Sequence, residues 1–225
     1  MNRDSAQGVL PIFSKFIFFD WYNTLSTANF WDSIIGNARH PLSSQMRAAL
    51  EDLFRRRKPL VGEWMRGKYT DAEIIATLNV QLPARYRTDY LLRELLRDCR
   101  NAPVDPDMAR IVRALRPSAF LAVASDNMAC FVHAAPKVLS AELHVDELLV
   151  SSDVGSLKKE APHRFFGPTL DRYGLAPADA LLIDDCTDTC AVFRSWGGTA
   201  IHFTSATQLR LELAHLVPAG LPATY

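Results

Sequence analysis

Carboxylate, hydroxyl and ammonium side chains follow short apolar runs at four widely separated places in this sequence. In chain order they are Asp20, Ser125, Lys158 and the pair Asp184-Asp185. An aspartate can act as a covalent nucleophile or as a metal ligand. A serine can donate a hydrogen bond to a developing negative charge, and a lysine can offset such a charge. Each residue alone could be a cap or a turn residue, but the four together in this order favour a reactive site.

The apolar runs that precede these residues predict the strands of a parallel sheet. They are nearly continuous in hydrophobicity, as expected for strands that are covered on both faces. The five runs are 16–19, 120–124, 148–151, 181–183 and 199–203. Helical patterns at 162–173 and 189–196 alternate with the later runs, which indicates right-handed βαβ units. The expected fold is therefore α/β, with a Rossmann-like parallel sheet flanked by helices, and its carboxyl edge is where such folds bind ligands.

The hundred or so residues between the first two runs have almost no strand pattern. Apolar spacing there predicts helices at 43–57, 70–80, 87–100 and 107–115. A crossover needs only one helix, so the others should form a small bundle beside the carboxyl edge. We therefore divide the chain into an α/β core of residues 1–28 and 104–225 and an inserted α-helical cap of residues 29–103. Residues 217–225 are expected to form a loose terminus.

Composition argues against several classes of protein. The 225 residues include 25 basic and 25 acidic ones, so the formal net charge is zero. Such a balance gives no general attraction to nucleic acid or to acidic membranes. No signal-peptide pattern and no run long enough to span a bilayer is seen, and four cysteines make no disulfide framework. We expect a cytoplasmic protein that binds a small molecule, and we leave a homodimer open.

Taken together, these residues resemble the four motifs of the haloacid dehalogenase-like (HAD) hydrolase superfamily. The resemblance implies that Asp20 is the nucleophile, that Ser125 and Lys158 are the second and third motifs, and that Asp184-Asp185 is the acidic fourth. The helical insert resembles the type 1 cap of this family. In its phosphatases the nucleophile attacks phosphorus and forms an aspartyl-phosphate that water hydrolyses.

The same resemblance implies a bound Mg²⁺ ion. Its ligands would be Asp20, the backbone carbonyl of Tyr22 and Asp185, with Asp184 nearby. Electrostatics supports a cation, because three ionised carboxylates within a few ångströms would repel one another, and Mg²⁺ prefers oxygen ligands. A lysine among these carboxylates in place of an ion would argue against this metal site. Next to these groups, Asn23 and Asn127 are expected to bind the small phosphorylated substrate.

Tyr22 departs from the pattern of the phosphatases. They usually carry a second aspartate at this position, which protonates the leaving group, and losing such an acid costs ~10²–10⁴ in rate. A tyrosine at this position resembles the 2-haloacid dehalogenases. The leaving group of their substrates is a halide ion, which departs without a proton. An acidic cluster of Asp184, Asp185 and Asp188 would however repel their carboxylate substrates. Our hypothesis is a Mg-dependent phosphohydrolase. The alternatives are a metal-independent 2-haloacid dehalogenase-type hydrolase and a non-catalytic HAD-like binding protein.

Several assignments stay open at this point. The spacing from Gly155 favours Lys158 as the third-motif lysine, whereas the spacing to Pro162 favours Lys159. Asp188 could assist the metal site. Asn23 replaces a usual glycine but tolerates the same turn with positive φ. In the insert, four side chains could line a substrate cavity or simply pack, namely Trp31, Trp64, Arg66 and Lys68.

Overall fold

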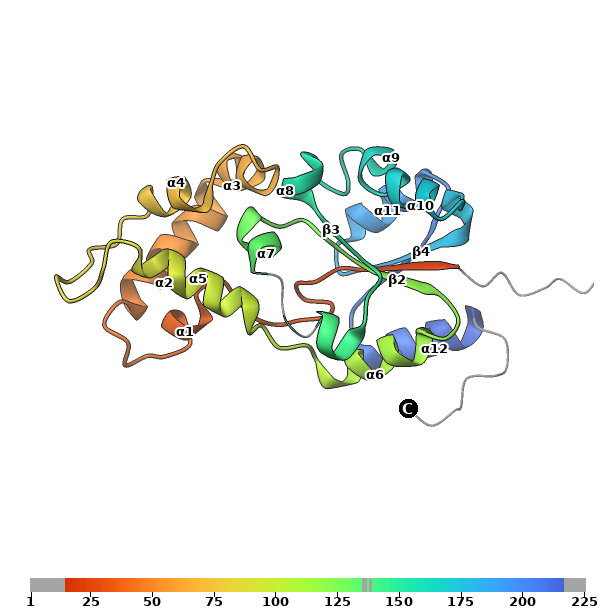
Figure 1. Cartoon of the computed structure of the whole chain (residues 1–225), viewed down its shortest axis with the longest axis horizontal. Coiled ribbons are helices and arrows are strands. Elements are labelled where there is room, and N and C mark those ends of the chain that lie inside the picture. Colours follow the sequence, from red (N-terminus) through yellow and green to blue (C-terminus); the bar gives the residue numbers. More distant parts are fainter. Residues whose placement is uncertain (1–14, 135–136, 138, 217–225) are drawn as a thin grey trace, which may run out of the picture.

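A five-stranded parallel sheet forms the centre of the protein (Figure 1). The computed structural model describes residues 15–134, 137 and 139–216. The strand order is β3-β2-β1-β4-β5, and every neighbouring pair is parallel. The strands are β1 (Phe16–Phe19), β2 (Phe120–Ser125), β3 (Glu147–Val150), β4 (Ala180–Asp184) and β5 (Thr199–His202). All five predicted strands are confirmed, and so is the α/β Rossmann-like fold.

The strand register places the acidic ends of two strands at one level. Phe19 is opposite Val123 on one side and opposite Ile183 on the other. Asp20 and Asp184 come next on their strands and therefore lie side by side at this edge, whereas β2 continues through Ala124 to Ser125. The central position of β1 follows from its sequence, because all four of its residues are buried.

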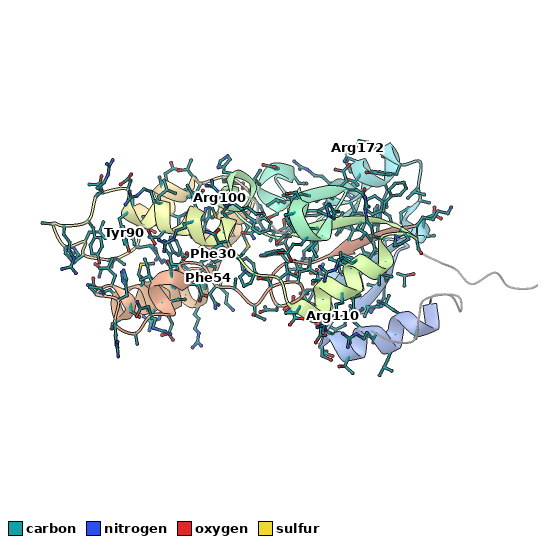
Figure 2. All side chains as sticks on the ribbon, turned by 60° about the horizontal axis from the view of Figure 1, so that its bottom comes forward. Phe30, Phe54, Tyr90, Arg100, Arg110 and Arg172 are labelled. Atoms are coloured by element: carbon teal, nitrogen blue, oxygen red, sulfur yellow. The ribbon has the colours of Figure 1, made fainter. Side chains whose placement is uncertain are left out.

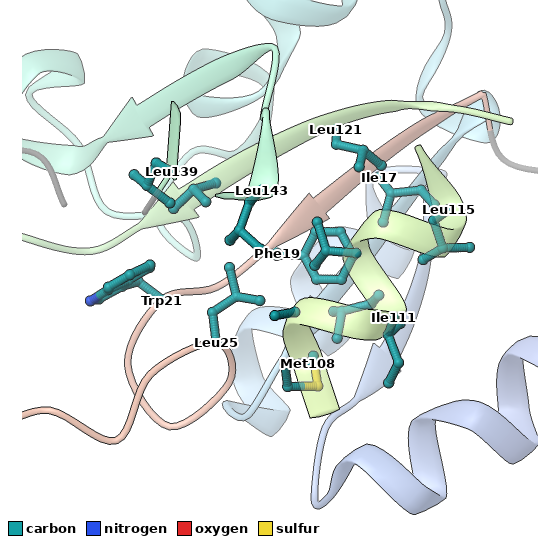
Figure 3. Packing of buried hydrophobic residues seen from close by; sticks show 14 of the residues in the cluster. Ile17, Phe19, Trp21, Leu25, Met108, Ile111, Leu115, Leu121, Leu139 and Leu143 are labelled. Carbon is teal, nitrogen blue, oxygen red and sulfur yellow. The ribbon is translucent and has the colours of Figure 1, made fainter. Parts of the chain in front are cut away.

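Alternate residues of β1 face two separate layers of the core. Ile17 and Phe19 pack with apolar residues of α6, as Figure 3 shows for Ile111 and Leu115. Helices α6 (Pro106–Leu115) and α12 (Ala206–Leu216) cover this face. Each buried side chain of this size contributes roughly 1.5–3 kcal/mol relative to its exposed state, so this layer holds the sheet and α6 together.

The other face of β1 carries Phe16 and Phe18. They pack with Phe166 and Phe193, and the rings of Phe18 and Phe166 meet edge to face at 4.9 Å. Helices α9 (Pro162–Phe165), α10 (Gly167–Arg172) and α11 (Thr187–Ser195) cover this face. The single helix predicted at 162–173 is therefore wrong, because a new helix begins at Gly167-Pro168, where proline offers no amide donor to continue the first.

Short helical segments complete the core. They are α7 (Ala129–His133), the π-helical turn Leu139–Leu143, α8 (Ser151–Val154) and the 3₁₀ turn Pro177–Asp179. Within the described ranges, no helix combines the length and the apolar character needed to cross a membrane.

The segment between β1 and β2 is helical, as predicted. Before α6 it contains α1 (Asp32–Ile35), α2 (Ser43–Glu51), a π-helical turn (Asp52–Arg56), α3 (Lys58–Met65), α4 (Asp71–Ala76) and α5 (Tyr90–Arg100). The helix expected at 43–57 is thus α2 followed by the π-helical turn, and α3 was not predicted. The helix expected at 70–80 is only α4, which begins at a capping box formed by Thr70 and Glu73.

These helices have a hydrophobic cluster of their own. Trp31 and Trp64 lie fully buried in it. The Trp31 indole donates to the Leu91 carbonyl at 2.7 Å, and the Trp64 indole donates to Asp71 at 3.0 Å. Both tryptophans therefore pack inside the insert.

The insert lies beyond the carboxyl ends of the strands (Figure 1). Its two connections to the core meet where the Ser26 hydroxyl donates to the Pro103 carbonyl at 2.6 Å. An ion pair between Arg66 and Glu160 joins α3 to the loop that carries Lys158. This position is the one expected of a cap, and the division at residues 28/29 and 103/104 stays a prediction.

Candidate active site

Three carboxylates meet at the carboxyl edge of the sheet. Asp20 follows β1, Asp184 is the last residue of β4, and Asp185 follows it. One oxygen from each of these side chains lies within 4.8 Å of the other two. Asp20 and Asp184 are buried, whereas Asp185 is partly exposed. The parallel register brings together residues that are more than 160 positions apart in the sequence.

Lys158 lies between two of these carboxylates. Its Nζ atom is 2.8 Å from Asp20 Oδ1 and 2.6 Å from Asp184 Oδ2, and the side chain is only 3% exposed. Lys159 instead faces Asp188 at 3.5 Å on the surface. The structure therefore places Lys158, and not Lys159, at the site.

Burial shifts the pKa of Asp20 and of Lys158 toward the uncharged form, and their mutual attraction opposes this. Burial raises the pKa of Asp20 to about 7, and the charge of Asp184 adds to this shift while Lys158 opposes it. Burial alone would lower the pKa of Lys158, but the two carboxylates more than offset this and raise it. Lys158 therefore remains a cation at neutral pH.

This ammonium corrects the charge argument for a metal. The sequence argument expected a metal ion to relieve the repulsion among these carboxylates, with Lys158 offsetting charge on the nucleophile. In the structure, Lys158 supplies part of the positive charge for both Asp20 and Asp184. One ammonium does not balance three carboxylates, however, since Asp185 makes no ion pair with it. The remaining negative charge still attracts a second cation.

The donor set fits Mg²⁺. Asp20, Asp184 and Asp185 offer carboxylate oxygens, which hard divalent cations prefer, and they form the metal-capable acidic group found among the described residues. The Cys186 amide holds Asp184 Oδ1 at 2.8 Å. Asp188 does not belong to this group, because its side chain is 73% exposed. The Tyr22 carbonyl stays a predicted ligand.

Asn23 positions Asp185. Its Nδ2 atom donates to Asp185 Oδ2 at 3.1 Å. The backbone of Asn23 has a φ of 58°, so the residue adopts the left-handed turn expected of an asparagine in place of glycine. Its predicted contact with substrate is untested.

Ser125 and Asn127 lie on the neighbouring strand end. Ser125 is the last residue of β2 and is buried. Asn127 is also buried, and its backbone amide donates to Ser151 Oγ at 2.9 Å. Ser151 Oγ donates in turn toward the Met65 carbonyl of the insert at 2.7 Å. The Asn127 Nδ2 atom is buried and meets no hydrogen-bond criterion in the described part of the chain, and it lies near the Tyr22 hydroxyl.

Tyr22 does not replace the aspartate that serves as the general acid at this position in related phosphatases. Burial, followed by the neighbouring thiols of Cys99 and Cys130, raises its pKa well above the ordinary value, and the Asn127 amide offsets only part of this. The hydroxyl is therefore protonated and lies close to α5 and α7, which carry the two thiols. The ring packs against Phe30, with 5.1 Å between the centroids.

Asp126 is a site residue that sequence reasoning missed. Its carboxylate accepts a hydrogen bond from the Lys158 backbone amide at 2.9 Å, and burial raises its pKa. It thus fixes the loop that presents Lys158. In the sequence Asp126 looks like part of a Ser-Asp-Asn turn. Its partner is a backbone amide 32 residues away, and such a contact requires no particular residue type that the sequence would reveal.

A pocket of about 520 Å³ is linked to the carboxylates through Asn23, which lines the pocket and hydrogen-bonds Asp185. The core contributes Tyr22 and Asn23 to its wall, and the insert contributes Phe30, Phe54 and Arg55 among others. Its volume lies within the range usual for small-molecule sites. Arg66 and Lys68, which sequence reasoning considered for such a cavity, are instead paired with acidic residues.

Comparison with known proteins identifies the class. Residues 15–195 match the family model of the haloacid dehalogenase-like hydrolases, and the chain belongs to this family. A search of curated proteins found no match.

Solved structures share the fold at low sequence identity. A predicted HAD-like hydrolase from Porphyromonas gingivalis is 15% identical, covers 90% of this chain and 98% of its own, and has a TM-score of 0.62. A HAD family enzyme from Bacteroides thetaiotaomicron, in complex with magnesium and inorganic phosphate, is 13% identical, with 84% and 94% covered and a TM-score of 0.59. The L-2-haloacid dehalogenase of Xanthobacter autotrophicus, with chloropropionic acid covalently bound, is 18% identical, with 91% and 84% covered and a TM-score of 0.58.

Proposed function

We propose that this HAD-like hydrolase is a Mg-dependent phosphohydrolase that acts on a small phosphorylated metabolite through an aspartyl-phosphate on Asp20. One observation carries the proposal: carboxylate oxygens of Asp20, Asp184 and Asp185 lie within 4.8 Å of one another, and a single ammonium faces them. This excess of negative charge suits a divalent cation and a phosphate group bound to it. It is poorly suited to a free carboxylate substrate.

The chain's own residues would divide the work as follows. Asp20 attacks phosphorus, and Lys158 holds the nucleophile in place while offsetting charge on the phosphoryl oxygens. Ser125 and the Asn127 amide donate hydrogen bonds to those oxygens. Mg²⁺, held by Asp20, Asp185 and the Tyr22 carbonyl with Asp184 nearby, would supply further stabilisation of the negative charge. Positioning and electrostatics are what phosphoryl transfer chiefly requires.

Hydrolysis of p-nitrophenyl phosphate tests the proposal. We expect turnover with Mg²⁺, loss of turnover after chelation, and loss to background in Asp20→Asn, which keeps the side-chain shape but removes the nucleophile. Folding of the variant is checked by circular dichroism. Turnover that does not require Asp20, or that is unchanged by chelation, would contradict the proposal.

The second candidate is a metal-independent 2-haloacid dehalogenase-type hydrolase. Tyr22 favours it, since no carboxylic acid stands at this position, and one of the similar structures is such a dehalogenase. Release of chloride from 2-chloropropionate in the absence of metal would support this candidate. A non-catalytic binding protein would show neither activity, and Mg²⁺ with beryllium fluoride, a phosphoryl mimic, would then not bind in calorimetry.

A further inference from the structure

Three aromatic rings form one wall of the pocket that Asn23 links to the carboxylates. Tyr22 packs on Phe30 with 5.1 Å between the centroids, and Phe30 stacks on Phe54 at 5.7 Å with an interplanar angle of 7°. Figure 2 shows Phe30 and Phe54 close together where the insert meets the core. Tyr22 comes from the core segment after β1, whereas Phe30 and Phe54 belong to the insert, Phe54 in its π-helical turn. Both units therefore contribute to an apolar surface that suits a flat ring.

This wall begins next to the reacting groups. Tyr22 is two positions from Asp20, and Asn23 both lines the pocket and hydrogen-bonds Asp185 at 3.1 Å. A phosphate held at the carboxylates would therefore place its organic group in this pocket.

The pocket offers no acid suited to protonating a leaving group. Among the described residues that line it, Glu51 is the single carboxylate. Glu51 is 62% exposed and pairs with Arg55 at 3.1 Å, so it lies at the rim and faces an arginine. A buried carboxylic acid is therefore not available in this pocket to protonate the leaving oxygen, so this oxygen must depart as an anion.

We infer that the substrate is an aryl phosphate, the phosphate ester of an aromatic hydroxyl group; this inference rests on the function proposed above. The aromatic wall recognises the ring, and the ring makes the missing acid unnecessary. A phenol has a pKa of ~10, as tyrosine does, whereas an oxygen that resembles water in acidity has a pKa near ~15.7. Phenolate is thus a far better unprotonated leaving group than an alkoxide.

The chemical step balances without a further reactant. The Asp20 carboxylate forms a bond to phosphorus, the bond from phosphorus to the aryl oxygen breaks, and its electron pair leaves with the phenolate. Water then hydrolyses the aspartyl-phosphate, which restores Asp20 and releases inorganic phosphate. The phenolate receives its proton from water.

Three esters of similar size test this on the wild-type protein. Phenyl phosphate has an aromatic ring and a good leaving group. Benzyl phosphate has an aromatic ring but a poor leaving group, and cyclohexyl phosphate has neither an aromatic ring nor a good leaving group. We expect kcat/KM for phenyl phosphate to exceed that for cyclohexyl phosphate by at least ~10², the lower size of an acid-catalysis effect. Benzyl phosphate should share the KM of phenyl phosphate but not its kcat. Among substituted phenyl phosphates, kcat/KM should rise as the leaving-group pKa falls.

Two variants separate ring recognition from general effects on folding. Phe54→Leu should raise KM for phenyl and benzyl phosphate several-fold and leave KM for cyclohexyl phosphate unchanged. Tyr69→Leu, which replaces an exposed aromatic residue of the insert, should change none of them. Equal kcat/KM for the phenyl and cyclohexyl esters, or no dependence on leaving-group pKa, would overturn this inference and leave the phosphohydrolase standing. Failure to hydrolyse any of the esters with Mg²⁺ would overturn both.

Discussion

At the scale of single residues, Lys158 is a buried cation in contact with two carboxylates. Its ammonium is buried between Asp20 and Asp184, and its backbone is held by Asp126. Breaking a buried pair leaves a charge without a partner, which costs far more than an exposed pair contributes. The same side chain therefore supports both the fold and the proposed chemistry.

Replacing Lys158 by methionine should lower the free energy of unfolding by roughly 3–5 kcal/mol, because two buried carboxylates lose their cation. Urea denaturation at pH 7 measures this change. Lys159→Met is the matched control: its ammonium is on the surface, 3.5 Å from an exposed aspartate, and it should cost less than ~1 kcal/mol. Similar costs for the two variants would contradict the assignment of Lys158 to the site.

The acidic pair of the fourth motif allows a second comparison. Asp185→Asn should weaken the binding of Mg²⁺ with beryllium fluoride by more than ~10-fold, the scale seen when even an outer-shell group is lost. Asp188→Asn should leave the affinity unchanged, because Asp188 lies outside the carboxylate group. Titration calorimetry measures both. An equal loss in the two variants would place the cation elsewhere.

How much of the site the sequence could predict depends on the kind of contact involved. The sequence placed Asp20, Ser125 and Asp184 at strand ends, because a buried apolar run followed by a polar residue marks such an end. It could not choose between Lys158 and Lys159, since neighbouring residues in a loop point in directions that spacing alone does not determine. Asp126 was missed because its partner is a backbone amide.

At the scale of elements, the strands were predictable and the short helices were not. A strand buried on both faces has an unbroken apolar run, as in β1. This pattern does not depend on how the individual side chains pack. Helix ends depend on local turns instead. The break at Gly167-Pro168 and the π-helical turn after α2 arise from single backbone positions, so periodicity did not show them.

The contact between α3 and α8 depends on a glycine. Gly67 has a φ of +72°, and a Cβ atom there would lie less than 3.0 Å from the Ser152 carbonyl oxygen. Only glycine combines this backbone conformation with such a close approach. Gly67 therefore sets how closely the insert sits on the core near the Lys158 loop.

Gly67→Ala should destabilise the protein by more than the ~1 kcal/mol that strain at a positive φ costs, because the Ser152 backbone must also move. Gly174→Ala is the control, since Gly174 has a φ of +65° and a Cβ there would meet nothing within 4 Å. Thermal unfolding and KM of both variants separate the two effects. An equal shift in melting temperature would show that the close approach costs nothing.

At the scale of the whole molecule, two units share one site. The core supplies the carboxylates and Lys158, and the insert supplies one side of the aromatic wall. The Arg66–Glu160 ion pair and the Ser26–Pro103 hydrogen bond join them at separate places. Any movement of the insert would therefore change the pocket more than the carboxylates, so under the proposed function the insert would affect substrate selection more than the chemical step.

Stability of the whole molecule should depend on pH through Asp146. Burial would raise the pKa of this carboxyl, but hydrogen bonds from the Arg116 guanidinium and the Leu121 amide outweigh burial and lower it. Asp146 thereby links the end of α6 to β2. This contact lies at the amino edge of the sheet, opposite to the carboxyl edge that carries the candidate site. A folded-state pKa below the unfolded value of ~3.9 means that the stabilisation is full above about pH 4 and is lost as the pH falls through the folded-state pKa.

Asp146→Asn should therefore lower the free energy of unfolding at pH 7 by about 1 kcal/mol, since Arg116 is partly exposed and the interaction is screened. The difference from wild type should shrink steadily below pH 4, because protonation removes the same charge from the wild-type carboxyl. Urea denaturation at pH 7, 5 and 3 measures it, and Asp171→Asn, at an exposed position of α10, controls for the general loss of an acidic residue. A difference that stays constant or grows on acidification would mean that the Asp146 carboxylate does not stabilise the fold through its charge.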